Sequence, residues 1–174
     1  MNGLNELKTR ITGKRLVVVG NKPDPKQPGA AYDLVCRIND ARTRVSLFDG
    51  KTDILFIDPR KGLSIERKKA TMEVMAVASA IFLTMPPSQE DKDFIESIGA
   101  TGKTWDLSSI LVPVMGVATT GGMALCALSM ATNNRMVTCY GMAGPNDIEQ
   151  YLAATGMSGC LVQEKAIRTM HLMI

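Results

Sequence analysis

The sequence predicts an α/β fold in which a mainly parallel sheet is covered by helices on both faces. Short apolar, β-branched runs recur along the chain and end at Gly, Asn or Asp, which is typical of buried strands in such sheets. Segments with helical spacing of apolar residues alternate with these runs, which indicates parallel pairing. With 174 residues, 45% of them hydrophobic and 21% charged, the chain has the balance of a globular protein. We expect one domain over residues 1–174.

Five strands are expected in chain order. They cover residues 15–20, 33–38, 52–57, 80–84 and 135–140. Several prolines exclude regular structure from residues 21–29, the loop between the first two strands. Asp58 and Pro59 end the third strand, and a proline pair ends the fourth.

Helices are expected between these strands and after the last one. They cover residues 62–80, 88–98, 119–130, a segment that starts at Asn146 or Asp147 and ends at 154, and residues 162–170. Ser88 caps the second helix, which has acidic residues in its first turn. Trp105 is assigned to a loop rich in Gly, Thr and Ser, where it either stacks on a ligand or pins the loop.

Charge and hydropathy exclude some classes of protein. The net charge of +3 is spread along the chain and does not by itself indicate nucleic-acid binding. The apolar windows fall short of the roughly 20 residues needed to cross a bilayer. The N-terminal stretch carries Glu6 and has no apolar core, so we expect no signal peptide, no membrane partner and a cytoplasmic protein. The cysteines are expected to be small buried hydrophobes: Cys36, Cys126, Cys139 and Cys160.

Polar residues and glycines gather at the carboxyl ends of the predicted strands, where α/β sheets bind ligands. They are Gly20, Asn21, Asn39, Asp40, Asp58, Tyr140 and Gly141. An Asn amide offers an acceptor and two donors without charge, and a neighbouring glycine lets a ligand approach the backbone. The alternative is that each Asn only tolerates turn geometry. Lys22 either pairs with a phosphate or is an exposed loop lysine.

A second candidate element is the run Thr119-Thr120-Gly121-Gly122, which opens a predicted helix. Free N–H groups at a helix start, joined by two hydroxyls, form a suitable site for a carboxylate or a phosphate. The alternative is that one of the two threonines is a plain N-cap.

Taken in order, these segments resemble the sialyltransferases, glycosyltransferase family twenty-nine. The large motif of that family corresponds to VVGN (18–21), Gly29, Arg37-Ile38-Asn39 and DGKTD (49–53). The small motif corresponds to ATTG (118–121), the helix after it and the strand end VTCYGM (137–142). Together the matching segments cover about 75 residues in the family's order.

The resemblance implies a Rossmann-like fold of the sialyltransferase type, a variant of the GT-A class, that binds a CMP-linked or related nucleotide sugar without a metal or other cofactor. It implies donor contacts from Asn21, Asn39, Thr119, Thr120 and Gly121. The donor site that we predict adds their neighbours and strand ends: Gly20, Lys22, Gly122, Tyr140 and Gly141.

The chain also departs from the family. The cysteines that the animal enzymes join are replaced by Lys14 and the region of Asn133, which agrees with a reducing compartment. The family's catalytic His, five residues before a Glu, has no counterpart. His171 is the only histidine and our candidate general base, with a structural role as its alternative. Asp147 or Glu149 could serve instead, or could simply cap their helix.

We therefore expect an inverting glycosyltransferase that moves sialic acid or a related sugar to an unknown acceptor hydroxyl. A glycan and a nucleic acid are both candidate acceptors, and a second copy of the chain could complete the acceptor site. The alternative is a catalytically inactive nucleotide-binding or scaffolding module that keeps the donor pocket. A third reading is an unrelated Rossmann-like enzyme.

Overall fold

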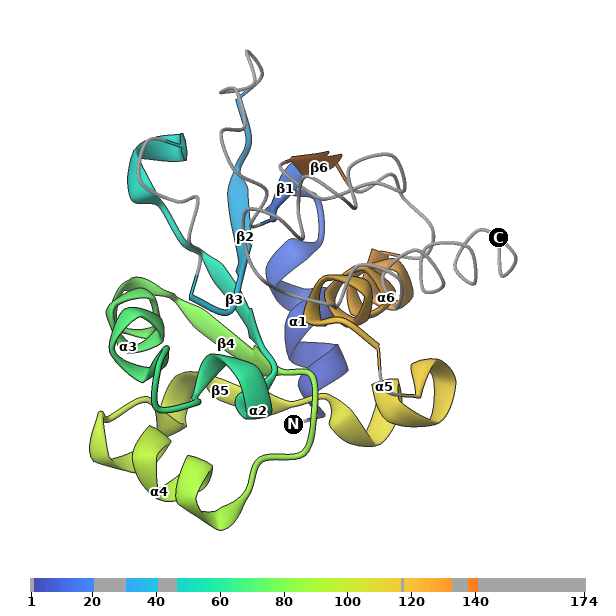
Figure 1. Cartoon of the computed structure of the whole chain (residues 1–174). Coiled ribbons are helices and arrows are strands. Elements are labelled where there is room, and N and C mark those ends of the chain that lie inside the picture. Colours follow the sequence, from blue (N-terminus) through green and yellow to red (C-terminus); the bar gives the residue numbers. More distant parts are fainter. Residues whose placement is uncertain (1, 21–30, 41–46, 117, 133–137, 141–174) are drawn as a thin grey trace, which may run out of the picture.

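A computed structural model of the chain describes residues 2–20, 31–40, 47–116, 118–132 and 138–140, and a six-stranded parallel sheet is its central feature (Figure 1). The strands are β1 (Leu16–Val19), β2 (Leu34–Ile38), β3 (Ile54–Ile57), β4 (Ala80–Leu83), β5 (Thr104–Asp106) and β6 (Thr138–Tyr140). Their order is β5-β4-β3-β2-β1-β6, and every neighbouring pair is parallel. The predicted α/β, Rossmann-like fold is confirmed.

Helices cover both faces of this sheet (Figure 1). One face packs against α1 (Gly3–Ile11), α5 (Ser108–Met115) and α6 (Thr120–Thr132). The other packs against α2 (Pro59–Gly62), α3 (Lys68–Val77) and α4 (Gln89–Ser97). Two short 3₁₀ helices, η1 (Leu47–Gly50) and η2 (Thr101–Lys103), precede β3 and β5. Because both faces are covered, β1, β3 and β4 are apolar at every position and do not alternate.

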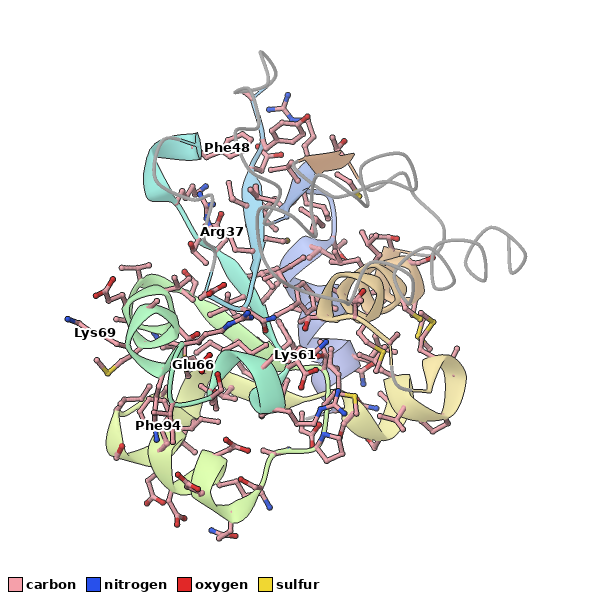
Figure 2. The ribbon with its side chains drawn as sticks, viewed as in Figure 1. Arg37, Phe48, Lys61, Glu66, Lys69 and Phe94 are labelled. Atoms are coloured by element: carbon pink, nitrogen blue, oxygen red, sulfur yellow. The ribbon has the colours of Figure 1, made fainter. Side chains whose placement is uncertain are left out.

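A third, smaller apolar cluster lies where η1 approaches β1 and β2. Val17, Val19 and Val35 are buried there, and the rings of Tyr32 and Phe48 meet edge to face at 5.8 Å beside them. Figure 2 shows Arg37 on β2 and Phe48 near η1. The Arg37 side chain is fully buried, and its Nε donates to the Lys51 carbonyl at 2.9 Å.

The helix predicted over residues 62–80 is confirmed only from Lys68 to Val77. The chain instead forms the short α2 directly after β3, and α3 begins only at Lys68. Asp58 caps α2, Pro59 occupies its first position, and Leu63 ends it. The Thr71 hydroxyl donates to the Gly62 carbonyl at 2.6 Å and so holds α3 against the end of α2.

Trp105 lies on a strand and not in the predicted loop. It belongs to β5, and its ring stacks on Phe82 with centroids 5.5 Å apart. The Arg10 guanidinium lies over the indole, 5.1 Å from its centroid. Of the two interpretations given above, the structure supports packing within the fold. The sequence pattern missed β5 because the strand is only three residues long.

The other predicted elements divide into two groups. Strands at 15–20, 33–38, 52–57 and 80–84 and helices at 88–98 and 119–130 are confirmed within two residues at each end. The final strand is described only as β6, and the helices expected up to residue 154 and over 162–170 lie outside the described residues.

In the described part of the chain, no single helix is long and apolar enough to cross a membrane; α5 and α6 reach that length only together, across a 107° bend.

Candidate functional site

The described residues of the predicted site lie at the carboxyl edge of the sheet. Strands β2 to β5 extend from β1 to one side and β6 pairs with its other side, so the winding direction changes at β1 and β6. Ligands of open α/β sheets bind outside the strand ends at such a point. Val19 is in register with Tyr140, so the predicted site residues Gly20 and Tyr140 follow or end neighbouring strands at this edge.

Asn39 occupies the end of β2 in an unusual backbone conformation. Its φ is +51°, in the left-handed region that Asn adopts more readily than most residues with a side chain. Its backbone N–H donates to the Phe56 carbonyl at 2.8 Å, which ties the turn to β3. The residue is 95% buried, so its amide needs hydrogen-bond partners.

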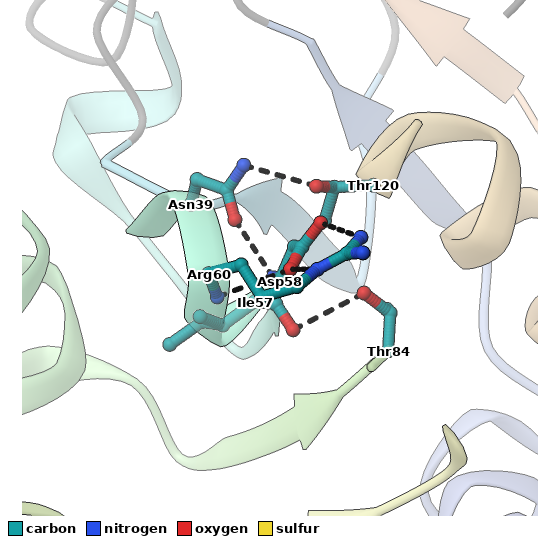
Figure 3. A network of polar contacts seen from close by, with 6 residues as sticks. All are labelled: Asn39, Ile57, Asp58, Arg60, Thr84 and Thr120. Carbon is teal, nitrogen blue, oxygen red and sulfur yellow. Dashed lines mark hydrogen bonds and ion pairs between the residues drawn. The ribbon is translucent and has the colours of Figure 1, made fainter. Parts of the chain in front are cut away.

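The Asn39 amide joins three elements of the fold (Figure 3). Its Oδ1 accepts from the backbone N–H of Asp58 at 2.9 Å, and its Nδ2 donates to the Thr120 hydroxyl at 3.1 Å. Asn39 and Thr120 are 81 residues apart and belong to the two motif segments that the sequence predicts to form one site. The structure brings these segments into direct contact.

Asp58 holds the next position along this edge. Its carboxylate caps α2 and forms a two-point ion pair with Arg60, Oδ1 to Nε at 3.0 Å and Oδ2 to Nη2 at 2.8 Å (Figure 3). The Asp58 side chain is fully buried, whereas the Arg60 side chain is 43% exposed. The hydrogen bonds to Asp58 raise the pKa of Arg60. Directly after β4, the Thr84 hydroxyl donates to the Ile57 carbonyl at 3.2 Å.

Gly62 is required by the close packing around Asn39. A Cβ at this position would lie 2.9 Å from Ile57 Cγ2 and 3.2 Å from Asn39 Oδ1. These are closer than ordinary carbon contacts, so a larger residue would displace the amide.

At the start of α6, one of the two threonines is a plain N-cap and the other contacts Asn39. The Thr119 hydroxyl accepts from the Gly122 N–H at 3.2 Å, and its carbonyl accepts from Met123, so Thr119 is the N-cap. Thr120 instead contacts Asn39. The run from Thr119 to Gly122 is buried, and the first-turn N–H groups that lack intrahelical partners lie at the same edge as Asn39.

The segment DGKTD lies at the opposite, amino edge of the sheet. There the Asp53 carboxylate accepts from the Val35 N–H at 2.7 Å, and Lys51 Nζ lies 3.2 Å from it and donates to the Asp33 carbonyl. Asp33 in turn accepts from the Arg15 N–H at 2.8 Å, and this hydrogen bond lowers the pKa of Asp33. These residues join β1, β2 and β3 rather than the candidate site.

Several predicted site residues lie outside the described part of the chain. They are Asn21, Lys22, Gly141, Asp147, Glu149 and the proposed base His171. Their roles remain predictions from the sequence.

The cysteine prediction is confirmed at two positions and wrong at one. Cys36 and Cys126 are buried free thiols, and burial raises the pKa of both. Cys139 is exposed and lies on β6, at one edge of the described sheet. Cys160 lies outside the described residues.

The pair of Asp58 and Arg60 is the feature that sequence reasoning missed, since it treated Asp58 mainly as a strand end. The available signal was Asp-Pro-Arg directly after an apolar strand, which indicates a capped helix start.

Among the described residues, no group of three or more His, Cys, Asp or Glu side chains could hold a metal ion. No protein-family model, curated protein or solved structure matches the chain.

Proposed function

We propose that this chain is a glycosyltransferase domain of the sialyltransferase type, which binds a CMP-linked or similar nucleotide sugar at the carboxyl edge of its sheet. The hydrogen bond between Asn39 and Thr120 is the observation that supports this most directly. It joins the two segments on which the resemblance rests, at the edge where α/β sheets bind nucleotides. Asn39 Nδ2 has a second hydrogen and Thr120 keeps its own hydroxyl hydrogen, so both can still donate to a ligand.

The proposed reaction is an inverting transfer. An acceptor hydroxyl oxygen forms a bond to the anomeric carbon while the bond from that carbon to the phosphate oxygen breaks. The electron pair of the broken bond stays on the nucleotide phosphate, and a base takes the hydroxyl proton. N–H and hydroxyl donors at the start of α6 would stabilise the charge on the departing phosphate.

A second candidate function is a binding module that keeps the donor pocket without the chemistry. The observation in its favour is that Asp58, a carboxylate at this edge, has both oxygens occupied by Arg60 and is unsuited to act as a base. The transferase therefore needs a base other than Asp58, and His171, outside the described residues, is our candidate.

One set of measurements separates the two functions. Titrating the protein with CMP-sialic acid, CMP and UDP-sugars gives binding, and the nucleotide released from each sugar donor gives turnover. We expect Thr120→Val to weaken binding of CMP-sialic acid by roughly tenfold, since it removes a hydroxyl that can bond a charged ligand. Thr132→Val is the matched control, because Thr132 ends the same helix and, among the described residues, its hydroxyl donates to the Ser129 carbonyl.

The outcomes differ for each reading. Nucleotide release that disappears in His171→Ala supports the transferase. Binding without release on any acceptor supports the module. No binding of any of these nucleotides contradicts both, and equal affinities of the two threonine variants contradict the placement of the site.

A further inference from the structure

We propose that Arg60 binds the phosphate of the nucleotide and that Asp58 positions it. This inference rests on the proposed function, because it names the side chain that recognises the anionic part of the same ligand. No part of the resemblance to sialyltransferases assigns a role to either residue.

The ion pair presents a guanidinium edge to solvent. A guanidinium carries five N–H groups in a planar fork. Asp58 takes one hydrogen from Nε and one from Nη2, and in the described part of the chain no other protein group accepts from Arg60. The remaining three N–H groups belong to a side chain that is 43% exposed, although its partner carboxylate is fully buried. The edge formed by Nε and Nη2 is therefore bonded to Asp58, and both hydrogens of Nη1 and one of Nη2 remain as donors for a ligand.

The position of the pair matches the candidate site. The Asp58 N–H bonds to Asn39, and Asn39 bonds to Thr120, so the pair and the start of α6 belong to one hydrogen-bonded network. In Figure 3 the Arg60 side chain extends across the strand ends toward the side on which Thr120 and Thr84 lie. Arg60 is thus directed along the edge where the ligand is expected.

The chemistry favours a phosphate as the ligand of this edge. Arg is always protonated at neutral pH, and the N–H groups of its fork match the spacing of phosphate oxygens. Two-point bonding to Asp58 fixes the guanidinium before the ligand arrives, so less side-chain freedom is lost on binding. If Arg60 served only to balance the charge of Asp58, its guanidinium would not need to be exposed.

The test compares the binding of CMP with that of cytidine, which differ by the phosphate. The double variant Asp58→Asn with Arg60→Met removes both charges, so no buried carboxylate is left without a partner, and Asn still caps α2. Arg60→Lys keeps the charge but removes the fork. Arg15→Met is the control, because it removes the arginine paired with Asp33 at the opposite edge of the sheet.

We expect the double variant to lose about tenfold or more in CMP affinity while its cytidine affinity stays unchanged. Arg60→Lys should fall between it and the parent protein, and Arg15→Met should bind CMP as the parent does. Circular dichroism and thermal melts verify that each variant is folded. An unchanged ratio of CMP to cytidine affinity in the folded double variant overturns the inference and leaves the proposed function intact.

A further arm covers the case in which the parent protein binds none of the nucleotides and nucleotide sugars tested, which contradicts the proposed function. Inorganic pyrophosphate is then the probe. Binding that is present in the parent and lost in the double variant supports an anion site at Arg60. Pyrophosphate binding that is absent, or equal in both proteins, overturns it.

Discussion

Asn39 shows how one buried side chain joins three elements at the candidate site. Its left-handed backbone turns the chain at the end of β2. Its amide oxygen accepts from the N–H of Asp58, directly after β3, and its amide nitrogen donates to Thr120 at the start of α6. A buried polar network of this kind is favourable only when every group has a partner. Residues that touch the Asn39 amide should therefore be sensitive to small changes in volume.

Gly62→Ala is the sharpest test at this scale. The added methyl would lie against Ile57 and Asn39 Oδ1, and we expect the free energy of unfolding to fall by about 1–3 kcal/mol. Gly102→Ala is the matched control, since nothing lies within 4 Å of its added Cβ. Urea unfolding followed by circular dichroism measures both. Equal stability of the two variants would mean that the packing at Gly62 is looser than described.

The elements of this fold are joined by a few long polar side chains as well as by apolar packing. At the amino edge, Asp33 and Asp53 each accept from a backbone N–H at the start of the neighbouring strand. On the side of α3 and α4, Lys103 reaches from η2 to the end of α3. Backbone groups at helix and strand ends have no partners within their own element, so these side chains satisfy them.

Lys103→Met tests this role at the end of α3. Lys103 Nζ donates to the carbonyls of Met75, Ala76 and Ala78 at 2.8, 3.2 and 2.8 Å. Its loss should lower the free energy of unfolding by about 1–3 kcal/mol and speed amide exchange in the last turn of α3. Lys92→Met on the exposed surface of α4 should stay within about 0.5 kcal/mol of the parent protein. Unchanged exchange in α3 would contradict the capping role.

The described part of the molecule forms three layers, in which helices cover both faces of the sheet (Figure 1). Cys36 on β2 is fully buried between neighbours on both sides, in register with Val18 of β1 and Ile54 of β3. Burial raises the pKa of its thiol, with the charge of Asp53 as a smaller cause. This thiol therefore reports on opening of the central sheet.

Alkylation of Cys36 should proceed only through unfolding of the sheet. We expect its rate at pH 8 to be lower in the folded protein than in urea by a factor that follows the free energy of unfolding. Because the folded pKa is raised, the stability from this group is complete below the ordinary value of 9.0 and is lost as pH rises above it. Peptide mapping by mass spectrometry measures the labelling. A rate equal to that in urea would contradict the burial.

Local patterns in the sequence determined most of the sheet. Buried parallel strands need uninterrupted apolar residues, so β1, β3 and β4 were visible as short β-branched and aliphatic runs with polar or proline ends. The capped helix α4 was equally clear, because Ser88 and Asp91 form a capping box. The break between α2 and α3 was not predicted, since it depends on a hydrogen bond from Thr71 to Gly62.

By itself, the sequence determined the fold class and the edge of the sheet to which Asn39 and Thr120 belong. Only the tertiary structure decided that these two side chains touch, that Asp53 of DGKTD accepts from the Val35 N–H, and that Asp58 holds Arg60 in place. The physical reason is the distance along the chain between the residues that interact. Strand and cap signals act between residues a few positions apart, whereas a contact across 81 residues exists only once the sheet has brought β2 and α6 together.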